Sequence, residues 1–453
     1  MMRVSLARIS IAAALAMVAG LCSAASAADW KAGAAKANIT PKQLMWMSGY
    51  GARDKPAEGK LTDLWAKALV IEDPQGKRCA IVTLDLVGIG RDITVPVRDA
   101  WQEKYKLDRA YTAICTSHTH CGPVVGRNLS AMYFLDETQT RLVGEYADEL
   151  QETLIFLVGK AIEDLAPAEL AWGNGRATFA VNRRNNKEPE VPRLIQEGKL
   201  AGPFDHDVPV LAVKGADGQL KAIVFGYACH ATVLSFYQWC ADYPGFAQSA
   251  IEAAHPGTQA MFFAGCGSDQ NPLPRRTVEL AQDYGKRLAT AVEETLSQLQ
   301  PVTGGISASY REIDLPLDKL PTRDELAAQS ASKDRYEAQR ARVLLARLDA
   351  GQSLSSTYPY PVQVWRLGDK LLWALLGGEV VVDYSLRLKK ELGQETTWAA
   401  GYTNDVMAYI PSRRVLLEGG YEGATAMRIY GLPTTWAPEV EERIIEAVKE
   451  LSK

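Results

Sequence analysis

The sequence predicts an α/β protein in which helices flank a mixed central β-sheet. Its composition is that of a globular chain with a large core, because 47% of its 453 residues are hydrophobic and 23% are charged. A β-α-β pattern occurs early in the chain, with an apolar β-branched run at 78–89, an amphipathic helix at 94–105 and an extended run at 110–118. Later pairs of strands have the spacing of hairpins, so antiparallel neighbours are expected beside parallel ones.

The later segments also alternate between strand and helix patterns. Strands are expected at 209–215, 220–230 and 260–265 and as a pair joined by a Gly-Asp turn within 362–379, and helices at 279–299 and 380–392. The first two strands are predicted to form a hairpin that turns at Ala216-Asp217-Gly218. The charged segment 322–352 is interpreted as a solvated helix or helical hairpin inserted into a single domain that spans 28–453.

The charge of the chain argues against one class of partner. The net charge is −4 and the sequence contains no run rich in Lys and Arg, so it has no electrostatic footprint for nucleic acid. A small molecule is the expected partner.

The N-terminus has the pattern of a secretory signal peptide. Arg3 and Arg8 precede an apolar stretch from Ile9 to Leu21, and small residues lead up to Ala27. The apolar stretch is shorter than the roughly 20 residues that span a bilayer. We therefore expect cleavage after Ala27 and export to the periplasm or out of the cell. No later segment is long and apolar enough for a transmembrane helix, so at most peripheral membrane contact is expected.

Export permits disulfide bonds among the cysteines of the mature chain. Six remain after cleavage, namely Cys79, Cys115, Cys121, Cys229, Cys240 and Cys266. Six cysteines allow fifteen pairings, and the sequence selects none of them.

Two of the five histidines lie two residues apart in AICTSHTHCGP, at 113–123. At a strand end, His118 and His120 would project from one face, about 6.5 Å apart along the chain. His230 ends another predicted strand, and Glu379 follows an apolar strand and two glycines that allow the backbone to approach a ligand. Imidazole and carboxylate are usual zinc ligands. The structural alternatives are histidines that are satisfied in the core or at the surface, and a glutamate that caps the following helix.

Several motifs resemble the neutral ceramidases, zinc-dependent amidases that cleave the N-acyl bond of ceramide. THTHCGP is similar to the family's His-Thr-His-Ser-Gly-Pro signature, and over most of the mature chain the family's order is kept by NITP, MSGYG, LDL, VNRR, ACHAT, GGE, NDVMAYI and GGYEGA. The resemblance implies a neutral-ceramidase-like catalytic domain with one zinc ion held by His118, His230, Glu379 and Tyr409. It also implies that the substrate amide is surrounded by His120, Arg183 and Tyr421, with core aromatics and a surface charge as the structural alternatives for the tyrosines and the arginine.

The chain departs from the family pattern in two places. In GCGSDQNP, Asn271 stands where the family has the serine described as the nucleophile, and a shift of the alignment would give that role to Ser268. An amide does not attack a carbonyl carbon, but it can donate a hydrogen bond to an oxyanion. The chain also ends soon after GGYEGA, so the C-terminal β-sandwich domain of typical ceramidases is expected to be absent.

The sequence thus predicts an exported zinc-dependent hydrolase that uses metal-activated water. The bond expected to be cleaved is an N-acyl amide, with an ester as the second choice. Asp269 or His120 is expected to be the general base. The alternatives are a hydrolase of peptide or sugar N-acyl groups, a serine hydrolase that uses Ser268, and a non-catalytic binding protein of the same fold. A soluble N-acyl substrate is expected to be favoured over long-chain ceramide. Aromatic rather than aliphatic side chains follow the histidine motifs, namely Tyr133, Phe134, Phe236, Tyr237 and Trp239.

Overall fold

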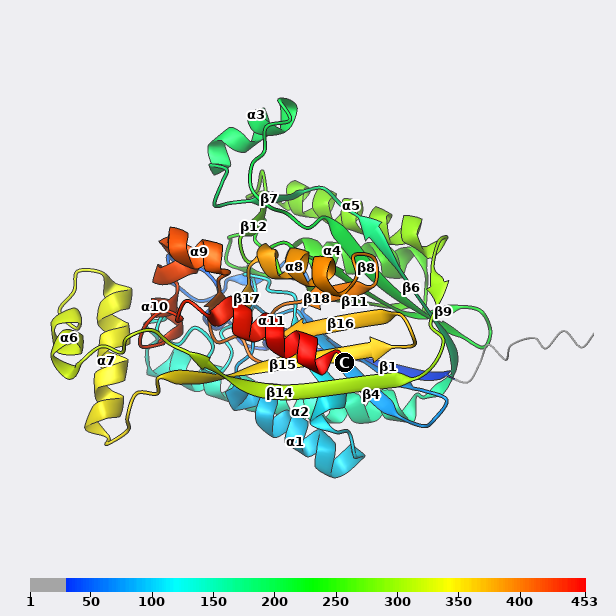
Figure 1. Cartoon of the computed structure of the whole chain (residues 1–453), viewed down its shortest axis with the longest axis horizontal. Coiled ribbons are helices and arrows are strands. Elements are labelled where there is room, and N and C mark those ends of the chain that lie inside the picture. Colours follow the sequence, from blue (N-terminus) through cyan, green and yellow to red (C-terminus); the bar gives the residue numbers. More distant parts are fainter. Residues whose placement is uncertain (1–29) are drawn as a thin grey trace, which may run out of the picture.

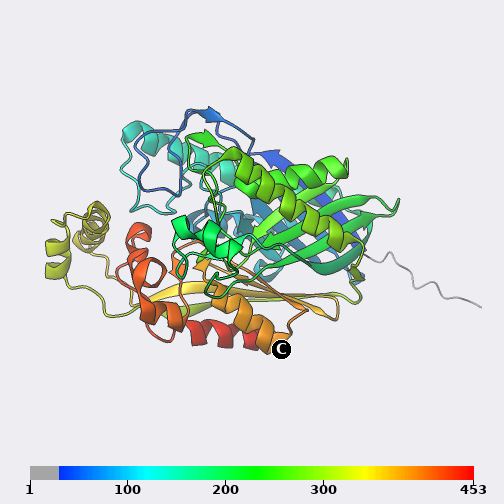
Figure 2. The same cartoon turned by 90° about the horizontal axis from the view of Figure 1, so that it is seen from above.

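Two β-sheets pack face to face and helices cover both outer faces, so the protein has four layers (Figure 1). In Figure 2 the helical layers lie along the upper and lower borders of the molecule, with the sheets between them. The computed structural model describes residues 30–453, so the predicted signal peptide and its cleavage after Ala27 lie outside the described residues. The prediction of an α/β fold with a mixed sheet flanked by helices is confirmed.

The larger sheet contains nine strands in the order β11-β9-β8-β6-β1-β3-β4-β5, with the short β13 paired to β6. Their bounds are β1 (Trp30–Asn38), β3 (Trp65–Glu72), β4 (Arg78–Leu84), β5 (Thr112–Thr116), β6 (Ala166–Arg176), β8 (Asp207–Gly215), β9 (Leu220–Tyr227), β11 (Gln259–Ala264) and β13 (Gln300–Pro301). The pairs β4/β5 and β9/β11 are parallel, and the others are antiparallel.

Two predicted motifs build this sheet. The β-α-β unit is formed by β4, the helix α1 (Arg91–Tyr105) and β5, and the predicted hairpin is formed by β8 and β9. Nearly every residue of β4 and all of β5 are buried, as expected for parallel strands that are covered on both faces.

The second sheet was not anticipated as a separate layer. It has the order β14-β15-β16-β18 and comprises β14 (Ile306–Pro316), β15 (Thr357–Leu367), β16 (Leu371–Leu376) and β18 (Thr397–Ala400). Along β15 the side chains alternate, so that Trp365 and Leu367 pack against the larger sheet while Val362 and Val364 face the helices outside. Because both faces are apolar, the sequence of this strand suits a place in one central sheet equally well.

Four helices cover the outer face of the larger sheet, namely α1, α2 (Glu137–Glu163), α4 (Asp242–Ala254) and α5 (Val278–Leu296). The outer face of the second sheet is covered by α8 (Val382–Leu392) and α11 (Val440–Leu451). Within residues 30–453, no helix is both long and apolar enough to cross a membrane.

The charged segment 322–352 forms a helical hairpin that projects from one end of the molecule (Figure 1). Its helices are α6 (Arg323–Gln329) and α7 (Arg335–Asp349), and a capping box between Thr322 and Glu325 begins the first. Leu326, Ala341 and Leu344 form a small core between the two helices.

Short elements complete the chain and position most of the site. They are β2 (Gly59–Lys60), β7 (Ala180–Asn182), α3 (Val191–Gln196), β10 (Gln238–Trp239), β12 (Gln270–Pro272), β17 (Glu379–Val380), β19 (Tyr409–Ile410), α9 (Arg413–Glu418), a π-helical turn (Tyr421–Thr425), α10 (Met427–Tyr430) and 3-10 turns at Arg109–Tyr111 and Glu188–Glu190. The six cysteines, whose pairing the sequence left open, are all buried and free in the part of the chain that the structure describes.

Candidate metal centre and active site

The paired histidines lie in a turn beyond β5, which ends at Thr116. The expectation that they share one face of a strand is therefore wrong. His118 instead has a left-handed backbone, with φ of +60°, a conformation that costs about 1–3 kcal/mol in a non-glycine residue. This turn brings His118 Nε2 within 3.1 Å of His120 Nε2. The two rings meet through this turn and not through strand alternation.

His230 and Glu379 reach the same place from other elements. His230 lies three residues beyond β9, and its N–H donates to the carbonyl of Gln270 at 3.0 Å. Glu379 begins β17, whose parallel pairing with β19 places it opposite Tyr409. A Cβ added to Gly378 would lie 2.8 Å from the carbonyl oxygen of Ala408. The glycine before Glu379 therefore permits close packing of two backbone segments, rather than the expected approach to a ligand.

The donor atoms of this cluster converge on one point. Glu379 Oε2 lies 3.1 Å from His118 Nε2 and 3.3 Å from His230 Nε2. The Tyr409 hydroxyl lies 3.4 Å from the same nitrogen of His230. Despite these distances, Glu379 Oε2 has no hydrogen-bond partner within residues 30–453.

These spacings fit a tetrahedral metal ion. Zinc bonds of 2.0–2.1 Å to nitrogen and oxygen place neighbouring ligands about 3.3 Å apart. His118, His120 and His230 are all buried and form the cluster of potential metal ligands that the described residues contain. The donor set and its spacing therefore fit a metal ion.

The outer ring nitrogens fix the orientation of two histidines. His118 Nδ1 lies 2.5 Å from the carbonyl oxygen of Val87, and His230 Nδ1 lies 3.2 Å from that of Gly267. With these nitrogens protonated as donors, both Nε2 atoms present a lone pair to the centre of the cluster.

Burial and neighbouring groups shift the pKa values of three side chains of the cluster. It lowers the pKa of His230 to about 4, with the charge of Arg183 acting in the same direction. Burial and the two neighbouring imidazoles hold the pKa of His120 well below its usual value. Burial alone would raise the pKa of Glu379, but the close imidazoles of His118 and His230 hold it well below its usual range. His120 and His230 are therefore neutral at neutral pH, and Glu379 is ionised.

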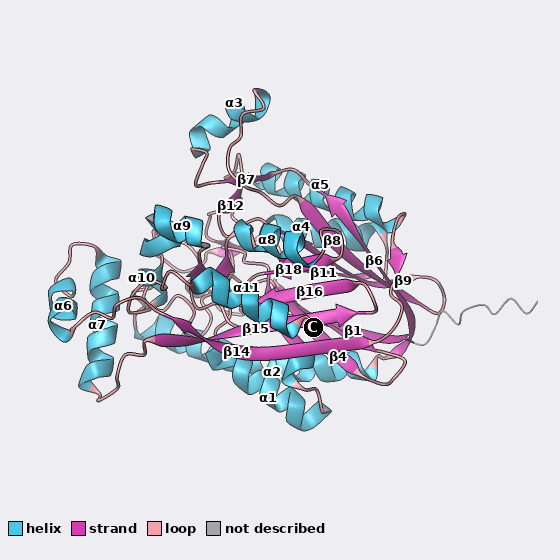
Figure 3. Ribbon diagram, in the orientation of Figure 1, coloured by secondary structure: helices cyan, strands magenta, loops and turns pink. Residues whose placement is uncertain are grey.

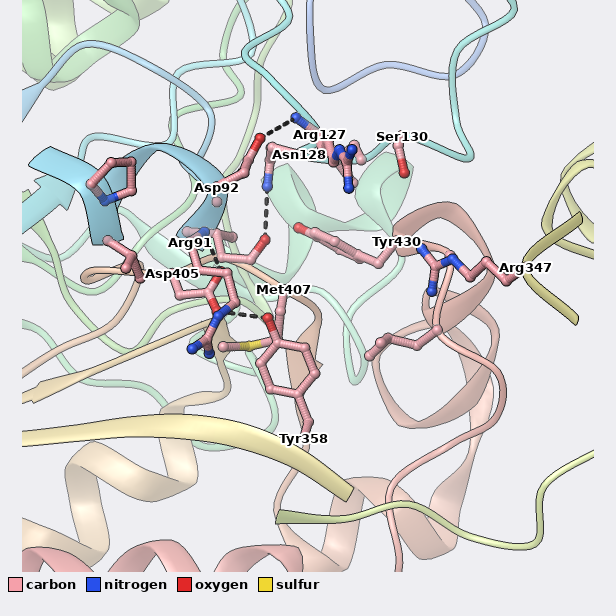
Figure 4. A pocket seen from close by; sticks show the side chains of 17 residues that line it. Arg91, Asp92, Arg127, Asn128, Ser130, Arg347, Tyr358, Asp405, Met407 and Tyr430 are labelled. Atoms are coloured by element: carbon pink, nitrogen blue, oxygen red, sulfur yellow. Dashed lines mark hydrogen bonds between the residues drawn. The ribbon is translucent and has the colours of Figure 1, made fainter. Parts of the chain in front are cut away.

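Tyr430 is a residue of this centre that sequence reasoning missed. Its hydroxyl donates a hydrogen bond to Glu379 Oε1, which leaves Oε2 to face the histidines. Tyr430 also lines a pocket of about 440 Å³ that contains none of the histidines (Figure 4). In this pocket Asp405 accepts hydrogen bonds from the Tyr358 hydroxyl at 2.7 Å and the Arg91 N–H at 3.2 Å.

Arg183 joins the remaining predicted residues into one network. Its guanidinium donates to the Tyr409 hydroxyl at 3.2 Å and to Asn271 Oδ1 at 3.3 Å. The same group lies 5.8 Å from the ring centre of Tyr421. Its third partner, Glu422 at 2.7 Å, was also missed, although it adjoins Tyr421 in the sequence. Burial would lower the pKa of Arg183, but Tyr409 and Glu422 hold it well above its usual value, so the charge is permanent.

The side chains of Asp269 and Ser268 do not share in this network. The carboxylate of Asp269 accepts hydrogen bonds from Val382 N–H at 2.9 Å and from the Asn182 amide at 3.0 Å, so it anchors the start of α8. Ser268 Oγ is buried and has no hydrogen-bond partner among the residues described. The structure therefore gives Ser268 no histidine to activate it as a nucleophile.

Comparison with known proteins identifies related sequences. The sequence profile described as "Neutral/alkaline non-lysosomal ceramidase, N-terminal" matches residues 30–271. The neutral ceramidase of Drosophila melanogaster is 24% identical over 336 residues, which cover 71% of this chain and 43% of the relative. Neutral ceramidase 2 of Arabidopsis thaliana is 28% identical over 196 residues, which cover 42% of this chain and 25% of the relative. The chain thus matches less than half the length of these curated relatives.

Solved structures have the same fold. The crystal structure of neutral ceramidase from Pseudomonas aeruginosa matches 93% of this chain and 74% of that chain, with a TM-score of 0.70 and 20% identity. A ceramidase complexed with C2 matches with a TM-score of 0.70 and 18% identity. The profile match covers more than half of the chain and includes His118, His120 and His230, so this chain belongs to the neutral/alkaline non-lysosomal ceramidase family.

Proposed function

We propose that the chain is a zinc-dependent hydrolase that cleaves the N-acyl amide bond of a small molecule. The observation that supports the metal is the convergence of the Nε2 atoms of His118 and His230 on Glu379 Oε2, an oxygen without a hydrogen-bond partner within the described residues. The choice of an N-acyl amide as the bond that is cleaved rests on membership of a family whose curated relatives are named neutral ceramidases.

In this proposal His118, His230, Glu379 and Tyr409 hold the zinc ion. When bound, zinc supplies a water ligand whose pKa is lowered to about 7 and polarises a carbonyl group. Neutral imidazole nitrogens and an ionised carboxylate are the forms in which these side chains bind a metal.

Arg183 and Tyr421 bind and orient the amide carbonyl. The guanidinium is charged, and a phenol with an ordinary pKa of about 10 is protonated, so both groups remain hydrogen-bond donors at neutral pH. One well-placed donor to a developing oxyanion is worth about 3–4 kcal/mol. Asn271 accepts a hydrogen bond from Arg183 and in this role positions the guanidinium.

We assign proton transfer to His120. Of the two groups that the sequence offered as general base, His120 lies in the cluster, with Nε2 3.1 Å from His118 Nε2. Both carboxylate oxygens of Asp269 already accept hydrogen bonds from other groups.

Metal analysis of the purified chain tests the proposal. We expect one zinc ion per chain, loss of amide hydrolysis on chelation, and recovery when zinc is restored. His118→Ala and His230→Ala should each abolish zinc retention, because each removes one of four ligands. Ser268→Ala is the matched control and should keep both zinc and most of its activity.

Two outcomes would contradict the proposal. Full zinc occupancy in both histidine variants would exclude the assigned ligands. A loss of a thousandfold or more in Ser268→Ala, with zinc retained, would establish a serine nucleophile instead.

A further inference from the structure

The pocket of about 440 Å³ that Tyr430 lines, called here the Tyr430 pocket, is separate from the histidine cluster (Figure 4). Its walls come from the start of α1, the turn at 127–130, helix α7, strand β15 and the segments 405–407 and 430–432. Sites for small molecules commonly have volumes of about 300–1,000 Å³. The Tyr430 pocket is therefore large enough to hold one.

Two arginines bring positive charge to this pocket. Arg127 and Arg347 both line it, and neither guanidinium has an ion-pair or hydrogen-bond partner within residues 30–453. A third arginine, Arg91, is already engaged, because its guanidinium donates to the Pro359 carbonyl at 3.0 Å and to Glu312 at 3.1 Å. A guanidinium presents several donors in a planar fork that matches a carboxylate. The two free guanidiniums are therefore available to bind an anion.

The two acids of the pocket are engaged by other groups. Asp405 accepts hydrogen bonds from the Tyr358 hydroxyl at 2.7 Å and from the Arg91 main-chain N–H at 3.2 Å. Asp92 accepts one from the main-chain N–H of Arg127 at 3.0 Å. The lining thus has three arginines against two aspartates, and its net charge is positive. An anion is favoured over a cation.

Much of the remaining lining is apolar. It is formed by the side chains of Val95, Leu129, Met407 and Leu432, beside the rings of Tyr358 and Tyr430. Apolar surface gains free energy when a hydrocarbon group replaces the water on it, and an inorganic anion offers no such group. Charge and lining together therefore fit an organic anion with a hydrocarbon body.

Tyr430 connects the pocket to the candidate metal centre. Its ring lines the pocket, and its hydroxyl donates to Glu379 Oε1. On another side the ring lies against that of Tyr409, with ring centres 6.4 Å apart. The pocket is thus the open side, into which the ring can move when the hydroxyl leaves Glu379. A molecule in the pocket would occupy that space and preserve the hydrogen bond.

We propose that the Tyr430 pocket binds an organic monocarboxylate through Arg127 and Arg347, and that this ligand holds Tyr430 on Glu379 and so tightens zinc binding. The anion site stands without the proposed function, whereas its effect on zinc rests on that function. The ligand acts because it fits the pocket only while the ring stays on Glu379. Linkage then requires that zinc tighten the binding of the carboxylate by the same factor.

Calorimetry with octanoate on the zinc-free chain tests the anion site. Octan-1-ol has the same hydrocarbon body without the charge, and inorganic phosphate has charge without the body. Octanoate should bind saturably and about tenfold or more tighter than either. Arg127→Met and Arg347→Met remove the charge and keep an extended side chain, so each should weaken octanoate binding about tenfold.

Arg342→Met is the matched control. Arg342 is another exposed arginine of α7, but it lies outside the pocket lining and donates to the Ser330 carbonyl at 3.2 Å. This variant should bind octanoate as the original chain does.

Competition with a chromophoric chelator then measures zinc affinity with and without saturating octanoate. In the original chain octanoate should tighten zinc binding about fivefold or more. Arg347→Met should lose this effect and keep the zinc affinity that the original chain has without octanoate. Tyr430→Phe keeps the ring and lacks the donor, so it should still bind octanoate, but octanoate should not change its zinc affinity.

The outcomes separate the anion site, its effect on zinc and the proposed function. The site would be overturned by the absence of saturable octanoate binding, by phosphate binding equally well, or by unchanged binding in Arg127→Met and Arg347→Met. Arginine-dependent binding that leaves zinc affinity unchanged would overturn the coupling while the proposed function stands. Arginine-dependent binding by a chain that retains no zinc would support the site and overturn the proposed function together with the coupling.

Discussion

The hydroxyl of Tyr430 determines which oxygen of Glu379 faces the histidines. It donates to Oε1, and Oε2 remains 3.1 Å from His118 Nε2. Hydrogen bonds from outside a metal centre orient its ligands, and their loss typically weakens metal binding by about 10–100-fold. Tyr430 is therefore a positioning residue, which acts on the metal through Glu379.

Tyr430→Phe should weaken zinc binding by about 10–100-fold while the fold is retained. The variant keeps the ring and removes only the donor, so Glu379 gains freedom to rotate. Competition with a chromophoric chelator measures the affinity directly, without reference to activity, and circular dichroism checks the fold.

Tyr146→Phe is the control for the loss of a buried phenol. The Tyr146 hydroxyl donates to the carbonyl of Ile39 at 2.8 Å, so this variant should lose about 1 kcal/mol of unfolding free energy and no zinc affinity. The positioning role of Tyr430 would be ruled out if both variants bound zinc as tightly as the original chain.

At the residue scale, local motifs made part of the site predictable. His118 and His120 are close in sequence, and Glu379 follows a distinctive pair of glycines. Tyr430 touches Glu379 across 51 residues, and Glu422 touches Arg183 across 239 residues. No spacing rule links residues so far apart, because the fold alone brings them together. For the same reason the sequence did not reveal that Asp269 is engaged by Val382 and Asn182.

At the element scale, the site depends on the pairing of β17 with β19. This parallel pair sets Glu379 opposite Tyr409, and Gly378 precedes it with φ of +75°. A Cβ on Gly378 would lie 2.6 Å from Ile410 Cγ1 as well as 2.8 Å from the carbonyl oxygen of Ala408. Both atoms belong to the chain that leads into or forms β19, so a side chain at 378 would push the two strands apart.

Gly378→Ala should therefore lower the unfolding free energy by about 2–5 kcal/mol, from left-handed strain and overpacking together, and should also weaken zinc binding. Gly198→Ala is the matched control, because Gly198 has φ of +63° and no atom within 4 Å of an added Cβ. That variant should lose about 1–2 kcal/mol, from strain alone, and bind zinc normally.

Urea unfolding of the zinc-free proteins measures both losses. If the two glycine variants lost equal unfolding free energy, the close packing of residue 378 against residues 408–410 would contribute nothing to the loss.

The elements themselves were more predictable than their grouping into sheets. The runs at 78–89 and 362–379 are apolar enough to indicate strands, and the structure contains β4, β15 and β16 there. Whether these strands belong to one sheet or to two stacked sheets depends on which layer each apolar face packs against. The sequence of a strand that is apolar on both faces does not specify that layer.

At the scale of the whole molecule, buried acids couple stability to pH. Burial raises the pKa of Asp85 to about 6, that of Asp242 to about 6 and that of Asp405 to about 7. An acid whose pKa is raised by folding binds more protons in the folded state than in the unfolded state. Its favourable contribution to the unfolding free energy is complete below the pKa of the acid in the unfolded chain, about 3.9. The contribution is lost as the pH rises through the pKa of the acid in the folded protein.

Asp405→Asn tests this coupling at the acid with the highest of the three values. Asparagine keeps an oxygen that can accept the Arg91 N–H, and its amide does not ionise. Between pH 4.5 and 7.5 the original chain should lose up to about 3 kcal/mol more unfolding free energy than the variant, because it alone must ionise a buried carboxyl. Urea unfolding of the zinc-free proteins at both pH values measures the difference and excludes the pH dependence of metal binding itself. Equal changes in the two proteins would mean that Asp405 ionises as easily in the fold as in water, and that Tyr358 and Arg91 fully compensate its burial.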